Sequence, residues 1–207
     1  MINIIDYEMG NLRSVAKAFE SHGFAVRVSA DPRDIAGADK LVLPGVGAFR
    51  DCIHNLRQGG FVEPLLRHVA AGKPLLGICV GMQMLFDESE EFGRHQGLGL
   101  IPGKVVRFPA GMEEGGERLK VPHMGWNNLE IRRPAPIFQG VADRSFVYFV
   151  HSYYCAAERA EDVAASCRYG EVEFAAALWR DNLFATQFHP EKSQSVGLSI
   201  FKNFGAL

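Results

Sequence analysis

The sequence predicts an α/β fold in which helices flank a doubly wound, mostly parallel central sheet. In the first half of the chain, short apolar runs alternate with amphipathic stretches of helical period, and such continuous runs are typical of parallel strands covered on both faces. After residue 97, strand-like runs follow one another with little helix between them. We expect these runs to be antiparallel strands that extend the same sheet. The length of 207 residues fits a single domain over residues 1–207.

Strand and helix are predicted to alternate through the first half. Predicted strands cover residues 2–5, 25–28, 40–43 and 74–78. Predicted helices cover residues 11–22, 48–57, 62–71 and 82–86. The first of these helices is indicated by apolar residues at helical spacing, namely Leu12, Val15, Ala16 and Phe19. Gly72 marks the C-terminal end of the third helix.

The second half is predicted to be mainly strand. The expected strands cover residues 104–108, 129–131, 146–150, 163–168, 174–179 and 183–187. A helix over residues 195–204 closes the chain, and residues 111–116 and 132–136 are turn-rich connectors. No internal repeat interrupts this pattern, which again favours one domain.

Charge and cysteine usage narrow the class of protein. The 22 Lys and Arg residues against 24 Asp and Glu give a formal net charge of −2, without a basic stripe of the kind that nucleic-acid-binding proteins show. No apolar run approaches the roughly 18 residues of a membrane helix, and the acidic Asp6 comes too early for a signal peptide. The four cysteines form no CxxC motif, which is typical of free thiols in a reducing compartment. We expect a cytoplasmic protein.

One five-residue stretch has the form of a nucleophile elbow. It lies between a predicted strand and a predicted helix and reads Gly77-Ile78-Cys79-Val80-Gly81. The two glycines allow a turn too sharp for a Cβ on either side, and the positive end of the following helix would favour a Cys79 thiolate. A lone cysteine is more often a packed small residue. The flanking glycines at this junction favour the nucleophile.

A base and its orienting group stand together in His189-Pro190-Glu191. In extended chain, residues two apart project to the same side, so Glu191 is predicted to hold the ring of His189. By itself this segment would fit a surface loop better than a catalytic pair. It follows the predicted strand 183–187, which we expect beside strand 74–78, so that Cys79, His189 and Glu191 gather at the carboxyl ends of neighbouring strands.

A glycine-rich loop over residues 44–49 follows the third strand. It is placed to aim a backbone N–H at a developing oxyanion, with a second N–H from Val80. A dinucleotide-binding loop is disfavoured, because Arg50 stands where the third glycine belongs, and no phosphate-binding Gly-Lys-Ser/Thr occurs. The seven histidines show no metal-ligand spacing, so neither a metal nor a cofactor is expected.

These motifs together resemble the class I (triad) glutamine amidotransferases over the whole chain. Residues 77–83 are similar to the nucleophile elbow of that class, and residues 187–193 to its His/Glu segment. Further stretches are similar to one branch of the class, namely Asp6-Tyr7-x-Met9-Gly10-Asn11-Leu12, the loop 44–49, Pro122-His123-Met124-Gly125-Trp126-Asn127 and His151-Ser152-Tyr153-Tyr154.

The resemblance implies a reaction and a partner. Cys79 would attack the side-chain amide of L-glutamine, His189 would protonate the departing ammonia, and water would hydrolyse the γ-glutamyl thioester. In that branch, ammonia passes to a separate cyclase subunit of (β/α)8 fold, in a heterodimer of L-histidine biosynthesis.

Further roles are implied position by position. Val46, Gly47 and Val80 would supply oxyanion donors, and Gln83, Gly47, Ser152 and Tyr153 would bind the substrate. Asn11, His123, Met124 and Trp126 would face the partner near the ammonia route. Composition alone favours Trp126 as a core aromatic, and Asn11 is also a good helix N-cap.

Other functions stay open at this point. The glutaminase of another synthase, such as anthranilate or pyridoxal phosphate synthase, would share the triad, although residues 122–127 disfavour it. A stand-alone γ-glutamyl hydrolase would use the same thiol chemistry without a partner. An inactive binding module is disfavoured because Cys79, His189 and Glu191 are all present.

Overall fold

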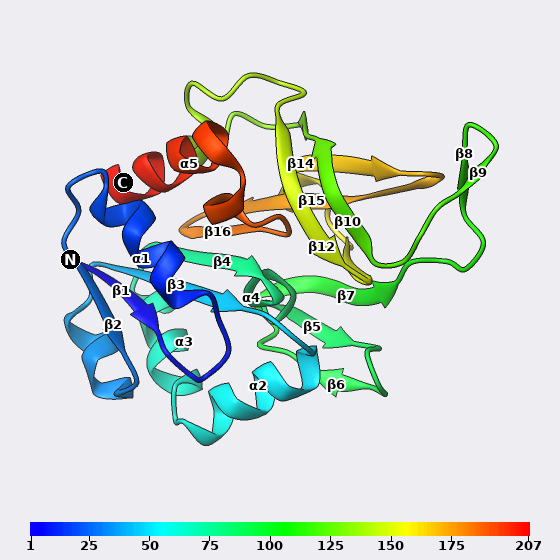
Figure 1. The fold of residues 1–207 in the computed structure, drawn as a ribbon. Helices are drawn as coiled ribbons and strands as arrows, with labels where there is room; N and C mark the ends of the chain where they lie inside the picture. Colours follow the sequence, from blue (N-terminus) through cyan, green and yellow to red (C-terminus); the bar gives the residue numbers. More distant parts are fainter.

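The computed structural model describes residues 1–207 and confirms the α/β class with a large, partly parallel sheet. Eight strands form this sheet in the order β11-β14-β15-β16-β4-β3-β1-β2 (Figure 1). Their bounds are β1 Ile2–Ile5, β2 Val26–Ser29, β3 Lys40–Gly45, β4 Leu75–Cys79, β11 Glu130–Ile131, β14 Val163–Tyr169, β15 Val172–Arg180 and β16 Leu183–Thr186. The predicted strands of the first half therefore form within one or two residues of their expected ends.

Helices cover both faces of the sheet. The α-helices are α1 Leu12–Glu20, α2 Phe49–Gln58, α3 Val62–Ala70, α4 Val80–Gln83 and α5 Gln194–Ala206, and the short 3-10 helices are η1 Pro32–Gly37, η2 Pro136–Phe138, η3 Ala160–Asp162 and η4 Pro190–Lys192. Figure 1 shows α1 and α5 together on one side, where Phe19 packs edge-on against Phe201, and α2 with α3 on the other. None of these helices has both the length and the apolar character needed to cross a membrane.

The strand order brings the chemically interesting segments together. Strands β2, β1, β3, β4 and β16 are parallel, and β16 pairs with β4 in the register Leu183 to Leu75 through Thr186 to Ile78. The predicted neighbourhood of these two strands is confirmed. Because parallel strands end at the same edge, the segments that follow β3, β4 and β16 all start at one edge of the sheet.

The sequence suggested that the strands of the second half extend this sheet. The structure shows that only some of them do. Only β11, β14, β15 and β16 join it. The remaining strands form a four-stranded sheet, a two-stranded ribbon and a projecting hairpin (Figure 1). These are β13 Tyr153–Ala157, β7 Ile101–Arg107, β5 Phe86–Ser89 and β6 His95–Gln96 in the small sheet, β10 His123–Asn128 with β12 Phe146–His151 in the ribbon, and β8 Glu113–Glu114 with β9 Glu117–Arg118 in the hairpin.

The helix predicted over residues 82–86 is wrong in most of its length. Helix α4 ends at Gln83, and Phe86 begins β5. The carbonyl of Leu85 accepts the N–H groups of Leu100 and Ile101, which ties the chain to β7. Met84, Leu85 and Phe86 are fully buried, and a short apolar run of this kind fits a buried strand as well as a helix.

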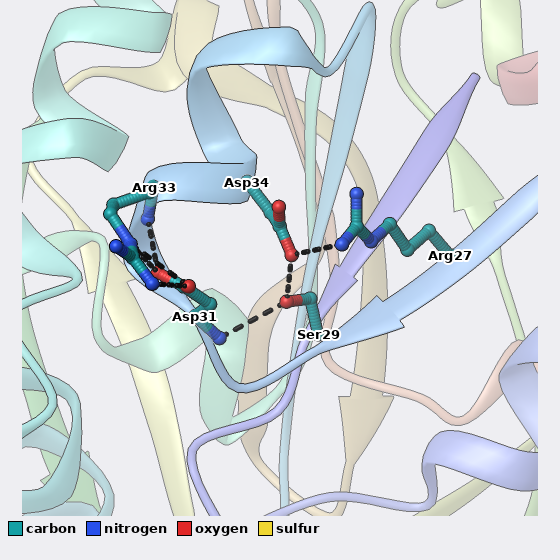
Figure 2. A network of polar contacts seen from close by, with 5 residues as sticks. All are labelled: Arg27, Ser29, Asp31, Arg33 and Asp34. Atoms are coloured by element: carbon teal, nitrogen blue, oxygen red, sulfur yellow. Dashed lines mark hydrogen bonds and ion pairs between the residues drawn. The ribbon is translucent and has the colours of Figure 1, made fainter.

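Polar side chains hold the corner between β2 and η1 (Figure 2). The Asp31 carboxylate accepts the backbone N–H and the guanidinium of Arg33. Asp34 accepts the hydroxyl of Ser29 and pairs with Arg27 at 2.8 Å. These short-range contacts connect the end of β2 to η1, which precedes β3.

The turn from β4 into α4 is packed against the backbone of β3. A Cβ on Gly81 would lie 1.8 Å from the carbonyl oxygen of Leu43, and one on Gly45 would lie 2.7 Å from the Gly81 nitrogen. A Cβ on Gly77 would meet the Gly81 backbone at 3.0 Å. The expectation that the elbow excludes side chains on both flanks of Cys79 therefore has a direct steric basis.

We expect Gly81→Ala to lower the free energy of unfolding by more than about 2 kcal/mol, because the new methyl group overlaps a backbone carbonyl that cannot move without shifting β3. Urea denaturation followed by circular dichroism measures this. Gly37→Ala is the matched control, since a Cβ there meets nothing within 4 Å. Equal stability of the two variants would contradict the steric account.

Candidate active site

Cys79 ends β4 in a strained conformation, with φ 55° and ψ −111°. A non-glycine residue at positive φ costs on the order of 1–3 kcal/mol and persists only where its surroundings enforce it. The following helix α4 is a single turn of four residues. Its dipole is therefore smaller than the sequence suggested, and most of the positive charge near the thiol must come from another group.

His189 supplies that charge. Its Nδ1 lies 2.9 Å from Oε1 of Glu191, and both side chains are almost fully buried. The backbone N–H of His189 donates to the carbonyl of Tyr148 in β12, which fixes the position of the His189 backbone. The contact with Glu191 is made by the turn of η4 rather than by extended chain, so the predicted pairing is present although its predicted backbone geometry is not.

The protonation of the pair follows from its surroundings. Burial alone would lower the pKa of His189, but the hydrogen bonds and negative charges of Cys79 and Glu191 outweigh it and raise that pKa to about 10. Burial would raise the pKa of Glu191, and the hydrogen bond and charge of His189 instead lower it. The arrangement therefore stabilises His189 as an imidazolium between the Glu191 carboxylate and the sulfur of Cys79.

A pocket of about 420 Å³ opens beside Cys79 and His189. Its wall includes all six residues predicted for the oxyanion site or the substrate, namely Val46, Gly47, Val80, Gln83, Ser152 and Tyr153. Five further residues line it without having been predicted, namely Glu91, Pro122, Val150, His151 and Lys192. The structure thus gathers segments from six parts of the chain around one thiol.

Gln83 ties the elbow to the opposite wall of the pocket. Its buried side-chain amide donates to the carbonyl of Tyr153 and to Oε1 of Gln187, each at 3.1 Å. The amide of Gln187 in turn lies 3.8 Å from the sulfur of Cys79. Gln83 therefore holds the Ser152-Tyr153 segment at a fixed position relative to Cys79.

A histidine pair continues this network. Nδ1 of His151 lies 2.8 Å from the Tyr153 carbonyl, which only accepts, so Nδ1 carries the hydrogen. Its Nε2 then accepts from Nδ1 of His123 at 3.1 Å, and Nε2 of His123 accepts from the Asn127 amide at 3.3 Å. Burial lowers the pKa of His123 to about 4 and that of His151 to about 3. Both rings are therefore neutral at pH 7.

Glu91 is the pocket residue that sequence reasoning missed most clearly. Its Oε2 accepts the N–H of Phe49, the first residue of α2, at 2.6 Å, and its other oxygen makes no hydrogen bond within the protein. Burial raises its pKa. It stands in a segment for which no strand was predicted, beside another glutamate, so nothing in the local pattern distinguished it.

The residues predicted to face a partner lie in three different settings. Asn11 starts α1, but its side chain does not cap the helix; it donates to Oε1 of Glu191 at 3.3 Å. His123 is buried, whereas Met124 and Trp126 are 66% and 46% exposed. Trp126 is therefore not a core aromatic. Phe146, at the paired end of β12, adds to the exposed apolar surface of the ribbon.

A second hollow, of about 530 Å³, lies between η1 and α3 near the start of β4, away from this edge. Its charged groups are already engaged, Arg67 with Glu63 and the Lys73 ammonium with the Ala38 carbonyl. No group of three or more His, Cys, Asp or Glu side chains is placed to hold a metal ion.

The chain matches known proteins over almost its full length. The family model for class-I glutamine amidotransferases matches residues 3–206. The imidazole glycerol phosphate synthase subunit HisH of Syntrophotalea carbinolica is 67% identical over 205 residues, covering 99% of each chain. The protein of the same name from Geobacter sulfurreducens is 64% identical over 206 residues, covering 100% of this chain and 98% of the relative.

Solved structures share the fold at lower identity. A glutamine amidotransferase crystal structure superposes with a TM-score of 0.75 and 18% identity, covering 100% of this chain and 99% of the other. PurLQS from Thermotoga maritima gives a TM-score of 0.75 and 17% identity, covering 98% and 96%. At these identities the match speaks for the fold alone.

We expect the free energy of unfolding to fall as pH drops from about 6.5 towards 4. In this range His123 and His151 bind a proton in the unfolded chain but stay neutral when buried in the folded protein. The expected slope is about 1.4 kcal/mol per pH unit for each histidine. Urea unfolding at pH 5, 6 and 7 measures it. His123→Gln should reduce this slope by about 1.4 kcal/mol per pH unit, because it removes one of the two groups responsible. A slope unaffected by His123→Gln would contradict the assignment.

Proposed function

Because the chain belongs to the class-I glutamine amidotransferase family, we propose that it is the glutaminase subunit of an imidazole glycerol phosphate synthase. The whole chain, residues 1–207, acts as a single domain of this family. The observation that carries the proposal is the buried arrangement of Cys79, His189 and Glu191, of which Cys79 and His189 line a pocket of about 420 Å³. Identity above 60% over the full length to proteins of that name supports the choice of synthase.

In the first half-reaction, the Cys79 thiolate attacks the carbonyl carbon of the glutamine side-chain amide. The oxyanion that forms needs N–H donors, for which Val80, Val46 and Gly47 are our candidates. As the tetrahedral intermediate collapses, the imidazolium of His189 gives its proton to the departing nitrogen, and ammonia leaves. Glu191 keeps Nδ1 of the ring protonated and the ring oriented throughout.

In the second half-reaction, water hydrolyses the γ-glutamyl thioester. His189, now neutral, takes a proton from the attacking water, and the same donors stabilise the second oxyanion. Cleavage of the C–S bond then releases L-glutamate and restores the ion pair. No step requires a metal or an organic cofactor.

Three residues of the pocket wall suit the amino-acid end of glutamine. The free oxygen of Glu91 offers an anionic partner for the α-ammonium group. Ser152 and Tyr153, held by Gln83, line the same pocket. We propose that these groups set the orientation of the substrate before attack.

The ammonia is consumed by a cyclase subunit of (β/α)8 fold that binds this chain in a heterodimer of L-histidine biosynthesis. The exposed apolar side chains of Met124, Trp126 and Phe146 are our candidates for that contact. Asn11 and His123 lie further in, and we propose that they border the ammonia route. We place the enzyme in the cytoplasm, in keeping with its four free cysteines.

Other activities fit less well. The glutaminase of anthranilate or pyridoxal phosphate synthase would share the triad, but the long full-length identities are to subunits of the imidazole synthase. A stand-alone γ-glutamyl hydrolase would leave the apolar ribbon surface without a purpose.

The proposal is tested by glutamate release from L-glutamine, measured for the chain alone and with the cyclase and its nucleotide ligand. We expect little turnover alone and a large rise in the complex. Cys79→Ala should abolish release by removing the nucleophile, while it still co-elutes with the cyclase.

Cys167→Ala is the matched control for that variant, because Cys167 is equally buried but lies outside the pocket. Equal turnover with and without cyclase would favour the stand-alone hydrolase. Glutamate release by Cys79→Ala would show that Cys79 is not the nucleophile.

The alkaline limb of the pH profile reports on His189. Its raised pKa keeps the general acid protonated to about pH 10, so we expect kcat/KM of the wild type to fall only above that pH. Glu191→Gln removes the negative charge that favours the imidazolium, and the limb should move down by roughly 1–3 pH units. An alkaline limb at the same pH in both proteins would show that Glu191 does not tune the ring.

A further inference from the structure

The hydroxyl of Ser193 makes two buried hydrogen bonds that its position in the chain does not predict. Ser193 is the N-cap residue of α5, where a serine hydroxyl ordinarily accepts an N–H of the first helical turn, but it makes no such bond. It donates its one hydrogen to the carbonyl of His189 at 2.7 Å and accepts the N–H of Tyr148 at 3.0 Å. Ser193 is 1% exposed, so both bonds are shielded from bulk water. A side chain that leaves its local role unfilled is expected where a functional site imposes another use.

These bonds attach the segment around His189 to the free edge of β12. Strand β12 belongs to a two-stranded ribbon and pairs with β10 along one edge only, with Tyr148 opposite Trp126. The N–H and C=O of Tyr148 both bond to groups outside the ribbon. The carbonyl accepts the N–H of His189 at 2.9 Å, and the N–H donates to the Ser193 hydroxyl. Ser193 therefore completes, with a side chain, the pairing that a neighbouring strand would otherwise make.

Helix α5 packs directly on the same segment. A Cβ on Gly197, in the first turns of α5, would lie 1.8 Å from the carbonyl oxygen of Pro190. Gln194, the first residue of α5, has φ 49°, a strained value for a residue with a side chain. The close approach leaves the turn of η4 little room to move towards α5, and the Ser193 hydroxyl ties that turn to β12.

The backbone of His189 is thus held on both sides of its Cα. Its N–H bonds to Tyr148 and its carbonyl to Ser193, while the ring bonds to Glu191. Ser193 itself does not line the pocket beside Cys79. It can therefore affect the reaction only through the position of His189, and a misplacement of about 1 Å can cost on the order of a hundredfold in rate.

We propose that Ser193 is a positioning residue that holds His189 where its ring can give a proton to the departing ammonia. This inference rests on the proposed glutaminase activity. The residues proposed to orient glutamine, namely Glu91, Ser152 and Tyr153, share no hydrogen bond with Ser193. The contribution of Ser193 is therefore made in the transition state of amide cleavage, and its loss changes kcat rather than KM.

Ser193→Ala tests the proposal, because it removes the hydroxyl that joins His189 to Tyr148. In the complex with the cyclase we expect kcat for L-glutamine to fall about ten- to a hundredfold, with KM within about twofold of the wild type. Ser193→Thr keeps the hydroxyl and should retain most of kcat. Its added methyl group has room in a hollow of about 410 Å³ that Ser193 lines.

Ser166→Ala is the matched control. Ser166 is also buried, at 3% exposure, and its hydroxyl oxygen accepts a hydrogen bond from Arg132 at 2.9 Å. It lies in β14 and does not line the pocket. The control therefore loses one buried, hydrogen-bonded hydroxyl, as Ser193→Ala does, and should keep the kcat and KM of the wild type.

A substrate whose leaving group needs no proton separates the placement of the acid from general damage to the site. With the γ-(p-nitrophenyl) ester of L-glutamate, the sulfur of Cys79 forms a bond to the same carbonyl carbon. The C–O bond then breaks, and p-nitrophenolate departs with the electron pair, without a proton from His189. The first-turnover burst of p-nitrophenolate measures this step. Ser193→Ala should slow the burst by at most about threefold, against the ten- to hundredfold loss with L-glutamine.

The outcomes separate this inference from the proposed function. A wild-type complex that releases no glutamate overturns the function itself. An active wild type with undiminished kcat in Ser193→Ala overturns the inference alone. Equal losses with L-glutamine and with the ester, or equal losses in Ser193→Ala and Ser193→Thr, would show that Ser193 does not position the acid.

Discussion

The close contact between the elbow and β3 is the constraint on which the site depends. The Gly81 backbone lies so near the Leu43 carbonyl that no side chain fits between them. This contact lets the chain turn from β4 into α4 at a single residue, Cys79, at the cost of a positive φ. Since Gly45 pairs with Cys79 across β3 and β4, the same packing sets the glycine-rich loop beside the thiol.

Burial acts on the three histidines around the site, yet they end in opposite protonation states. His123 and His151 make hydrogen bonds only with neutral groups, so loss of solvent lowers the pKa of both. His189 is buried as well, but it lies between Cys79 and Glu191, and two anionic partners outweigh the loss of water. The neutral rings of His123 and His151 therefore hold the Tyr153 carbonyl, whereas the charged ring of His189 can transfer a proton. The groups around each ring make this difference.

The sequence predicted those parts of the site that depend on local pattern. The glycines around Cys79 and the His189 to Glu191 spacing are short motifs, and strand β16 beside β4 follows from parallel strand order. The helix predicted over residues 82–86 failed because buried apolar runs carry no periodicity that separates strand from helix. Contacts such as Asn11 with Glu191, 180 residues apart, depend on packing that no local pattern encodes.

Strand β10 connects the molecular surface with the wall of the pocket through simple alternation. Successive side chains of a strand point to opposite faces, so His123 enters the core while Met124 projects outward. The inward ring holds His151, which holds the Tyr153 carbonyl that Gln83 also binds. The exposed side chain of Met124 and the hydrogen-bond chain that ends at Cys79 thus begin at adjacent residues of β10.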